Sequence, residues 1–169
     1  MVKKLDTRTV VYLGVLTALE IVLSRFLSLS AWNIKIGFSF VPVAAAAMLF
    51  GPLPAAIVAA LGDFLGAILF PIGPYFPGFT LTAFLTGLTF GFFLYKKRGA
   101  LRALGAVAVV QLLLGLLLNT LWISLLYHSP FGPLMATRAI QCAVLGPVQF
   151  LVILLLGRAL DTYGKRMLT

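Results

Sequence analysis

Three basic residues that interrupt apolar sequence are the first candidates for chemistry. Arg25, Lys35 and Arg138 fall on the predicted outer side of the membrane bundle described below, where other Lys and Arg residues are not expected. Each alone is most simply explained by contact with lipid headgroups or by pairing with Glu20 or Asp63. Together they favour a site for an anionic ligand, because a buried cation without a partner is costly. Arginine suits a carboxylate, since its planar fork donates two parallel hydrogen bonds.

Aromatic residues occur in the same parts of the sequence as these cations. The expected ligand-stacking residues are Trp32, Phe70, Tyr75, Phe76 and Trp122. An aromatic belt at the membrane interface is the alternative explanation, and it suffices for Phe79 and Tyr127. A pocket lined by flat rings and cations would accept a planar aromatic molecule that carries a carboxylate.

Amide side chains within the predicted helices extend this candidate site. Asn119 and Trp122 are three residues apart, as are Arg138 and Gln141, so each pair shares a helix face. Amides present paired donors and acceptors, which suit the edge of a heterocycle. Hydrogen bonds between helices explain them equally well.

The two carboxylates within predicted helices have competing explanations. We expect Asp63 to form an ion pair with Arg25 or Arg138, and hydrogen bonding to an amino-heterocycle is the alternative. Glu20 could instead be the proton-coupling carboxylate of a small exporter of cationic compounds. The three outer cations argue against a cationic ligand.

The composition indicates that all these residues belong to a polytopic membrane protein. Of 169 residues, 62% are apolar and 10% are charged, and the mean hydropathy is +1.10. A soluble domain has about a quarter charged residues, and a small globule could not bury so much apolar surface. Soluble enzymes, nucleic-acid binders and disordered proteins are therefore excluded. The single cysteine, Cys142, excludes an intramolecular disulfide, and no removable signal peptide is apparent.

Proline and glycine divide the apolar sequence into six predicted helices within one all-α domain, residues 1–169. Their approximate ranges are 9–28, 38–50, 53–70, 79–95, 102–126 and 136–160. The helix pair around residue 51 should form a tight hairpin, and residues 71–78 should form a structured loop. No period-two alternation indicates a β-barrel. Six helices place ten of the thirteen Lys and Arg residues on the side of both termini, which is therefore predicted to be cytoplasmic.

The motifs that are missing favour a binding protein over an enzyme. The sequence has no phosphate-binding loop, no zinc-protease motif and no nucleophile elbow. Transport against a gradient would therefore take its energy from a partner or from ion coupling. Gly14 and Ala18 form a small-x-x-x-small pattern on which a partner helix could dock.

Several blocks of the sequence resemble the substrate-binding S components of energy-coupling factor (ECF) vitamin transporters, most closely those specific for folate. The blocks are LSRF at 23–26, FSFVPV at 38–43, MLFGP at 48–52, GDFLGA at 62–67, FPIGPYFPGFTL at 70–81 and LNTLW at 118–122, with Arg138. The resemblance covers nearly the whole chain, and its middle blocks are the most specific.

This resemblance implies six transmembrane helices in the cell membrane of a prokaryote, with the vitamin pocket on the extracellular side. It also implies a T component and two ATPase subunits as partners, with ATP and Mg bound by those ATPases and no cofactor in this chain. The family docks its T component on an Ala-x-x-x-Ala pattern, whose first position here is Gly14. Folate matches the predicted rings and cations, and another anionic vitamin such as pantothenate is the alternative ligand.

Overall fold

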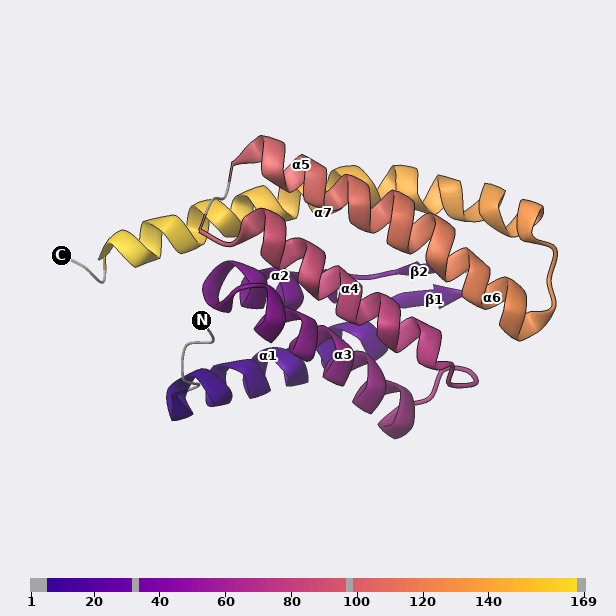
Figure 1. The fold of residues 1–169 in the computed structure, drawn as a ribbon, viewed down its shortest axis with the longest axis horizontal. Coiled ribbons are helices and arrows are strands. Elements are labelled where there is room, and N and C mark those ends of the chain that lie inside the picture. Colours follow the sequence, from indigo (N-terminus) through magenta and orange to yellow (C-terminus); the bar gives the residue numbers. More distant parts are fainter. Residues whose placement is uncertain (1–5, 32–33, 97–98, 167–169) are drawn as a thin grey trace.

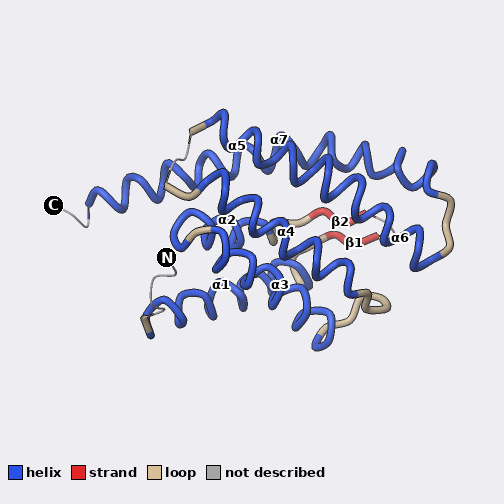
Figure 2. The backbone as a smooth tube through the Cα atoms, in the orientation of Figure 1, coloured by secondary structure: helices blue, strands red, loops and turns tan. Residues whose placement is uncertain are grey.

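The computed structural model describes residues 6–31, 34–96 and 99–166 and is dominated by helices. Its elements are α1 (Thr7–Arg25), β1 (Leu29–Ala31), β2 (Ile34–Ile36), α2 (Phe40–Phe50), α3 (Pro52–Leu69), α4 (Pro77–Leu94), α5 (Ala100–Ala108), the π-helix η1 (Val109–Leu118), α6 (Asn119–Tyr127) and α7 (Phe131–Arg166). Figure 1 shows the order of these elements, and Figure 2 shows that helices make up almost all of the drawn backbone.

Within the described ranges, five helices are long and apolar enough to cross a membrane, which matches the composition. They are α1, α3, α4, the continuous rod Ala100–Tyr127 and α7 up to Thr162, whereas α2 is a shorter apolar helix. The predicted helix 102–126 is this continuous rod, made of α5, η1 and α6. The start of α1 and the end of α7 lie at the same end of the molecule (Figure 1).

Two chain breaks follow directly from glycine and proline. Gly51 separates α2 from α3 with φ of 97°, a left-handed conformation that favours glycine, and the predicted tight hairpin is confirmed. Pro52 and Pro77 begin α3 and α4, where a missing backbone N–H costs no helical hydrogen bond. The predicted loop 71–78 is therefore two residues too long at its end, because Pro77 and Gly78 belong to α4.

Other predicted boundaries also need correction. The first helix was predicted to reach residue 28, but α1 ends at Arg25 and an antiparallel hairpin of β1 and β2 follows, with Ser30 opposite Lys35. The last helix extends over Phe131–Arg166 instead of 136–160, and Pro147 lies inside it. Hydrophobicity identifies an apolar segment but does not mark where its helical hydrogen bonding stops.

The helices α3 and α4 pack closely because small residues meet at their contact. A Cβ on Gly91 would overlap Pro52, and a Cβ on Gly87 would overlap the backbone of Ala55. Phe90 beside them is fully buried. This contact fixes the wall from which several residues of the cavity described next project.

Candidate ligand-binding cavity

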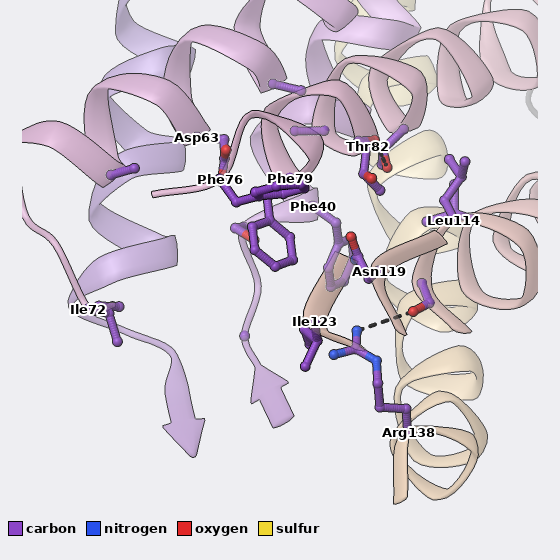
Figure 3. A pocket seen from close by; sticks show the side chains of 18 of the residues that line it. Phe40, Asp63, Ile72, Phe76, Phe79, Thr82, Leu114, Asn119, Ile123 and Arg138 are labelled. Atoms are coloured by element: carbon purple, nitrogen blue, oxygen red, sulfur yellow. Dashed lines mark hydrogen bonds between the residues drawn. The ribbon is translucent and has the colours of Figure 1, made fainter. Parts of the chain in front are cut away.

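A cavity of about 660 Å³ lies between the α1–α4 half of the bundle and the rod α5–η1–α6 with α7. This volume is within the range of small-molecule sites, roughly 300–1,000 Å³. Figure 3 shows side chains from both halves pointing into it. Its lining includes seven of the predicted site residues: Arg25, Asp63, Tyr75, Phe76, Asn119, Arg138 and Gln141.

Arg138 places a guanidinium group in the wall formed by α7. Its side chain is 8% exposed, and its Nη2 donates a hydrogen bond to the backbone oxygen of Gly115 at 3.1 Å. Figure 3 shows the guanidinium directed from α7 toward the cavity, next to Ile123. A buried guanidinium in this position can bind a carboxylate with charge-assisted hydrogen bonds.

Arg25 is held on the opposite wall by Asp63, which confirms the predicted ion pair. Arg25 Nη2 lies 3.8 Å from Oδ1 of Asp63 and donates to the backbone oxygen of the same residue at 3.3 Å. Thr80 donates to Asp63 Oδ2 at 2.9 Å, and the hydroxyls of Tyr75 and Thr80 are 3.1 Å apart. These contacts connect the end of α1 to α3, to the start of α4 and to the loop before it.

Glu20 also lines the cavity and is only 7% exposed. It lies five residues before Arg25 on α1, which corresponds to about 7.5 Å along the helix axis. A Cβ on Gly62 of α3 would overlap the Glu20 carboxylate. The absence of a side chain at position 62 therefore leaves the space that this carboxylate occupies.

A pair of amides that sequence reasoning missed lies on the rod and on α7. Gln111 of η1 donates to Gln149 of α7 at 2.8 Å, both side chains line the cavity, and Gln149 is 3% exposed. The sequence feature that could have identified Gln111 and Gln149 is the one that identified Asn119 and Gln141, namely a polar residue within an apolar helix. These four amides give the cavity both donors and acceptors.

Aromatic rings make up a second part of the lining. Phe76 and Phe79 meet edge to face with ring centroids 6.1 Å apart, and both rings lie in the cavity with Phe40 in Figure 3. Phe79 and Tyr127, which an interfacial belt would have explained, line the cavity as well. These rings provide flat apolar surfaces for a planar ligand.

Four of the predicted ligand-binding residues are not among the described lining. Trp122 contacts two lining residues instead: its Nε1 donates to Thr82 at 3.0 Å, and its ring centroid lies 5.6 Å from that of Phe76. Phe70 packs against Phe26, with ring centroids 5.0 Å apart. Trp32 lies outside the described residues, as does the side chain of Lys35 on β2.

The predicted docking residues Gly14 and Ala18 are both exposed on α1. A Cβ built on Gly14 would meet nothing within 4 Å. Among the residues that the structure describes, a side chain at position 14 would therefore have room on the surface of α1. In the described part of the chain, no group of three or more His, Cys, Asp or Glu side chains could hold a metal ion.

Comparison with known proteins identifies the family. The model of the family described as "ECF-type riboflavin transporter, S component" matches residues 4–162. The folate transporter FolT of Clostridium novyi (strain NT) is 43% identical over 144 residues, which cover 85% of this chain and 84% of the relative. FolT of Leuconostoc mesenteroides subsp. mesenteroides is 34% identical over 153 residues, which cover 86% and 82%.

Solved structures agree with these relatives. A crystal structure of FolT bound with folic acid matches with a TM-score of 0.87 and 37% identity, covering 91% of this chain and 95% of that one. The S component of a bacterial ECF transporter matches with a TM-score of 0.50 and 22% identity over 94% of both chains, which supports the fold alone. The chain therefore belongs to the family of ECF transporter S components, the substrate-binding membrane subunits of these transporters.

Proposed function

We propose that this chain binds folate from outside the cell and delivers it into the cell together with a T component and two ATPase subunits. The observation that carries the proposal is the guanidinium of Arg138 within an aromatic-lined cavity, in a chain 43% identical to a folate transporter. Folate combines a planar pteridine and an aminobenzoate with a glutamate that carries two carboxylates. Rings and a guanidinium together suit such a molecule.

The lining favours folate over the two other vitamins that deserve comparison. Riboflavin, which the family description mentions, is planar but has no carboxylate to pair with Arg138. Pantothenate has a carboxylate but no ring to contact Phe76 and Phe79. Folate is the one of the three that uses both kinds of lining group.

The proposed orientation places both termini in the cytoplasm. The rod α5–η1–α6 counts as one helix, so α1, α2, α3, α4, the rod and α7 give six. The exposed cations Arg8, Lys96, Arg102 and Arg158 belong to the ends of helices that the positive-inside rule assigns to the cytoplasm. The cavity would then open to the outside near Tyr75 and Tyr127.

The energy for transport would come from the partners. ATP and Mg would bind at the two ATPase subunits, with no cofactor in this chain. The exposed small residues Gly14 and Ala18 would let a helix of the T component approach α1 closely.

Identification of the bound vitamin tests this function. The protein would be purified in mild detergent, any small molecule released by denaturation would be identified by mass spectrometry, and emptied protein would be titrated calorimetrically with pteroylglutamate, riboflavin and pantothenate. We expect pteroylglutamate to be released and to give the tightest binding. Heat with riboflavin or pantothenate and none with pteroylglutamate would overturn the proposal.

A further inference from the structure

Glu20 is a carboxylate within a membrane-spanning helix that the proposed function has not yet used. It lines the cavity with 7% of its side chain exposed. Acidic residues inside membrane helices are costly and mark ligand, ion or proton sites. Glu20 therefore offers a carboxylate in the cavity wall to a ligand group that donates hydrogen bonds.

The adjacent helix α3 has space for this carboxylate and for Arg25 side by side. A Cβ on Gly62 would overlap the carboxylate of Glu20, and a Cβ on Gly66 would lie 2.8 Å from Nε of Arg25. Gly62 and Gly66 are four residues apart, which is about one helical turn. They therefore face Glu20 and Arg25, which lie on neighbouring turns of α1. The position of Glu20 is thus set by the packing of α1 on α3.

The two carboxylates of the cavity have different environments. Asp63 accepts a hydrogen bond from Thr80 at 2.9 Å and lies 3.8 Å from Arg25, near the loop before α4. Glu20 lies about 7.5 Å further from the end of α1 than Arg25 does. Asp63 therefore lies near the loop before α4, whereas Glu20 lines a part of the cavity farther from that loop.

A carboxylate complements one edge of a pteridine particularly well. The 2-amino group and the adjacent ring N–H form two parallel donors, which match the two oxygens of a carboxylate. The corresponding edge of a flavin presents one N–H between two carbonyl oxygens. Those oxygens would face the carboxylate with lone pairs, which disfavours binding.

We propose that Glu20 accepts hydrogen bonds from the 2-amino group and adjacent N–H of the ligand's heterocycle and thereby selects amino-pteridines over flavins. Arg138 on the opposite wall binds the carboxylates at the other end of the same ligand. This assignment rests on the proposed function, because it requires a folate-type ligand.

The test compares two ligands on two proteins. Pteroylglutamate and an analogue whose 2-amino group is replaced by methyl would be titrated into the wild-type protein and into Glu20→Gln. We expect the wild type to prefer pteroylglutamate by at least about tenfold. Glu20→Gln should weaken pteroylglutamate by about 10- to 100-fold, as expected for hydrogen bonds to a charged group. The analogue keeps the ring N–H but lacks the 2-amino donor, so its loss should be smaller than that of pteroylglutamate by about threefold or more.

Thr17→Ala is a matched control on the same helix. Thr17 is buried but its hydroxyl donates to the backbone oxygen of Leu13 at 2.8 Å within α1, and it does not line the cavity. Both affinities should therefore stay at the wild-type value in this variant. A ligand-selective loss in Glu20→Gln alone would support the assignment.

Equal weakening of both ligands, or no change in either, would overturn the role of Glu20. If Glu20 carried protons, Glu20→Gln would change the pH dependence of transport with both affinities unchanged, and this result also overturns it. Should Glu20→Gln fail to fold, a wild type without preference between the ligands would overturn it. Absence of any pteroylglutamate binding by the wild type would instead overturn the proposed function, and this assignment with it.

Discussion

Replacement of Arg138 by alanine tests the anionic part of the proposed ligand most directly. Arg138 is 8% exposed as a whole residue and lines the cavity, so a hydrogen bond from it to a ligand carboxylate would be largely shielded from water. Such a charged hydrogen bond contributes about 1.5–3 kcal/mol. Since each 1.4 kcal/mol is about a factor of ten, Arg138→Ala should weaken pteroylglutamate binding by roughly 10- to 150-fold.

A ligand without carboxylates separates this effect from a general disturbance of the cavity. Isothermal titration of emptied protein in detergent would compare pteroylglutamate with 6-hydroxymethylpterin, which keeps the pteridine and lacks the glutamate. Arg138→Ala should change the affinity for the pterin by less than about twofold, because only the carboxylates contact the guanidinium. Equal losses for both ligands, or unchanged binding of pteroylglutamate, would refute the reasoning.

Two further substitutions test packing and docking. Gly91→Ala should destabilise the protein by about 1–3 kcal/mol because its Cβ would overlap Pro52. Thermal unfolding in detergent would compare this variant with Gly146→Ala, where a Cβ meets no described atom within 4 Å. Equal melting temperatures of the two variants would contradict the prediction. Gly14→Trp should leave folate affinity unchanged in the isolated protein but reduce copurification with the T component and folate uptake, because it obstructs close helix approach beside Ala18. Unchanged assembly would exclude this surface.

Much of the helical organisation could be predicted because bilayers impose simple requirements. Long uncharged segments must be helical to satisfy their backbone groups in lipid, and proline with glycine marks where they turn. The hairpin at Gly51 is an example, since its φ of 97° suits glycine and Pro52 can begin the next helix. Such local rules need no knowledge of neighbouring helices.

The cavity lining was harder to predict because it depends on how the helices are rotated relative to one another. Trp122 shares an apolar helix with Asn119, yet of the two only Asn119 lines the cavity, while the Trp122 indole donates to the hydroxyl of Thr82. The π-helix η1 between Val109 and Leu118 changes the angular spacing of side chains along the rod, so spacing rules for an α-helix do not apply through it. The pairing of Gln111 with Gln149 likewise depends on the relative placement of two helices.

The pairing of charges changes the argument about what the cavity selects. Three outer cations predicted a site for an anionic ligand, but Arg25 pairs with Asp63, and the side chain of Lys35 lies outside the described residues. Arg138 and Glu20 thus place a guanidinium and a carboxyl group in walls formed by α7 and α1. A cavity of cations alone would accept any small anion, whereas opposite charges favour a ligand with carboxylates at one end and hydrogen-bond donors at the other. Specificity for folate would then require both residues. Loss of Arg138 should reduce the preference for ligands with carboxylates, and loss of Glu20 should reduce the preference for amino-pteridines.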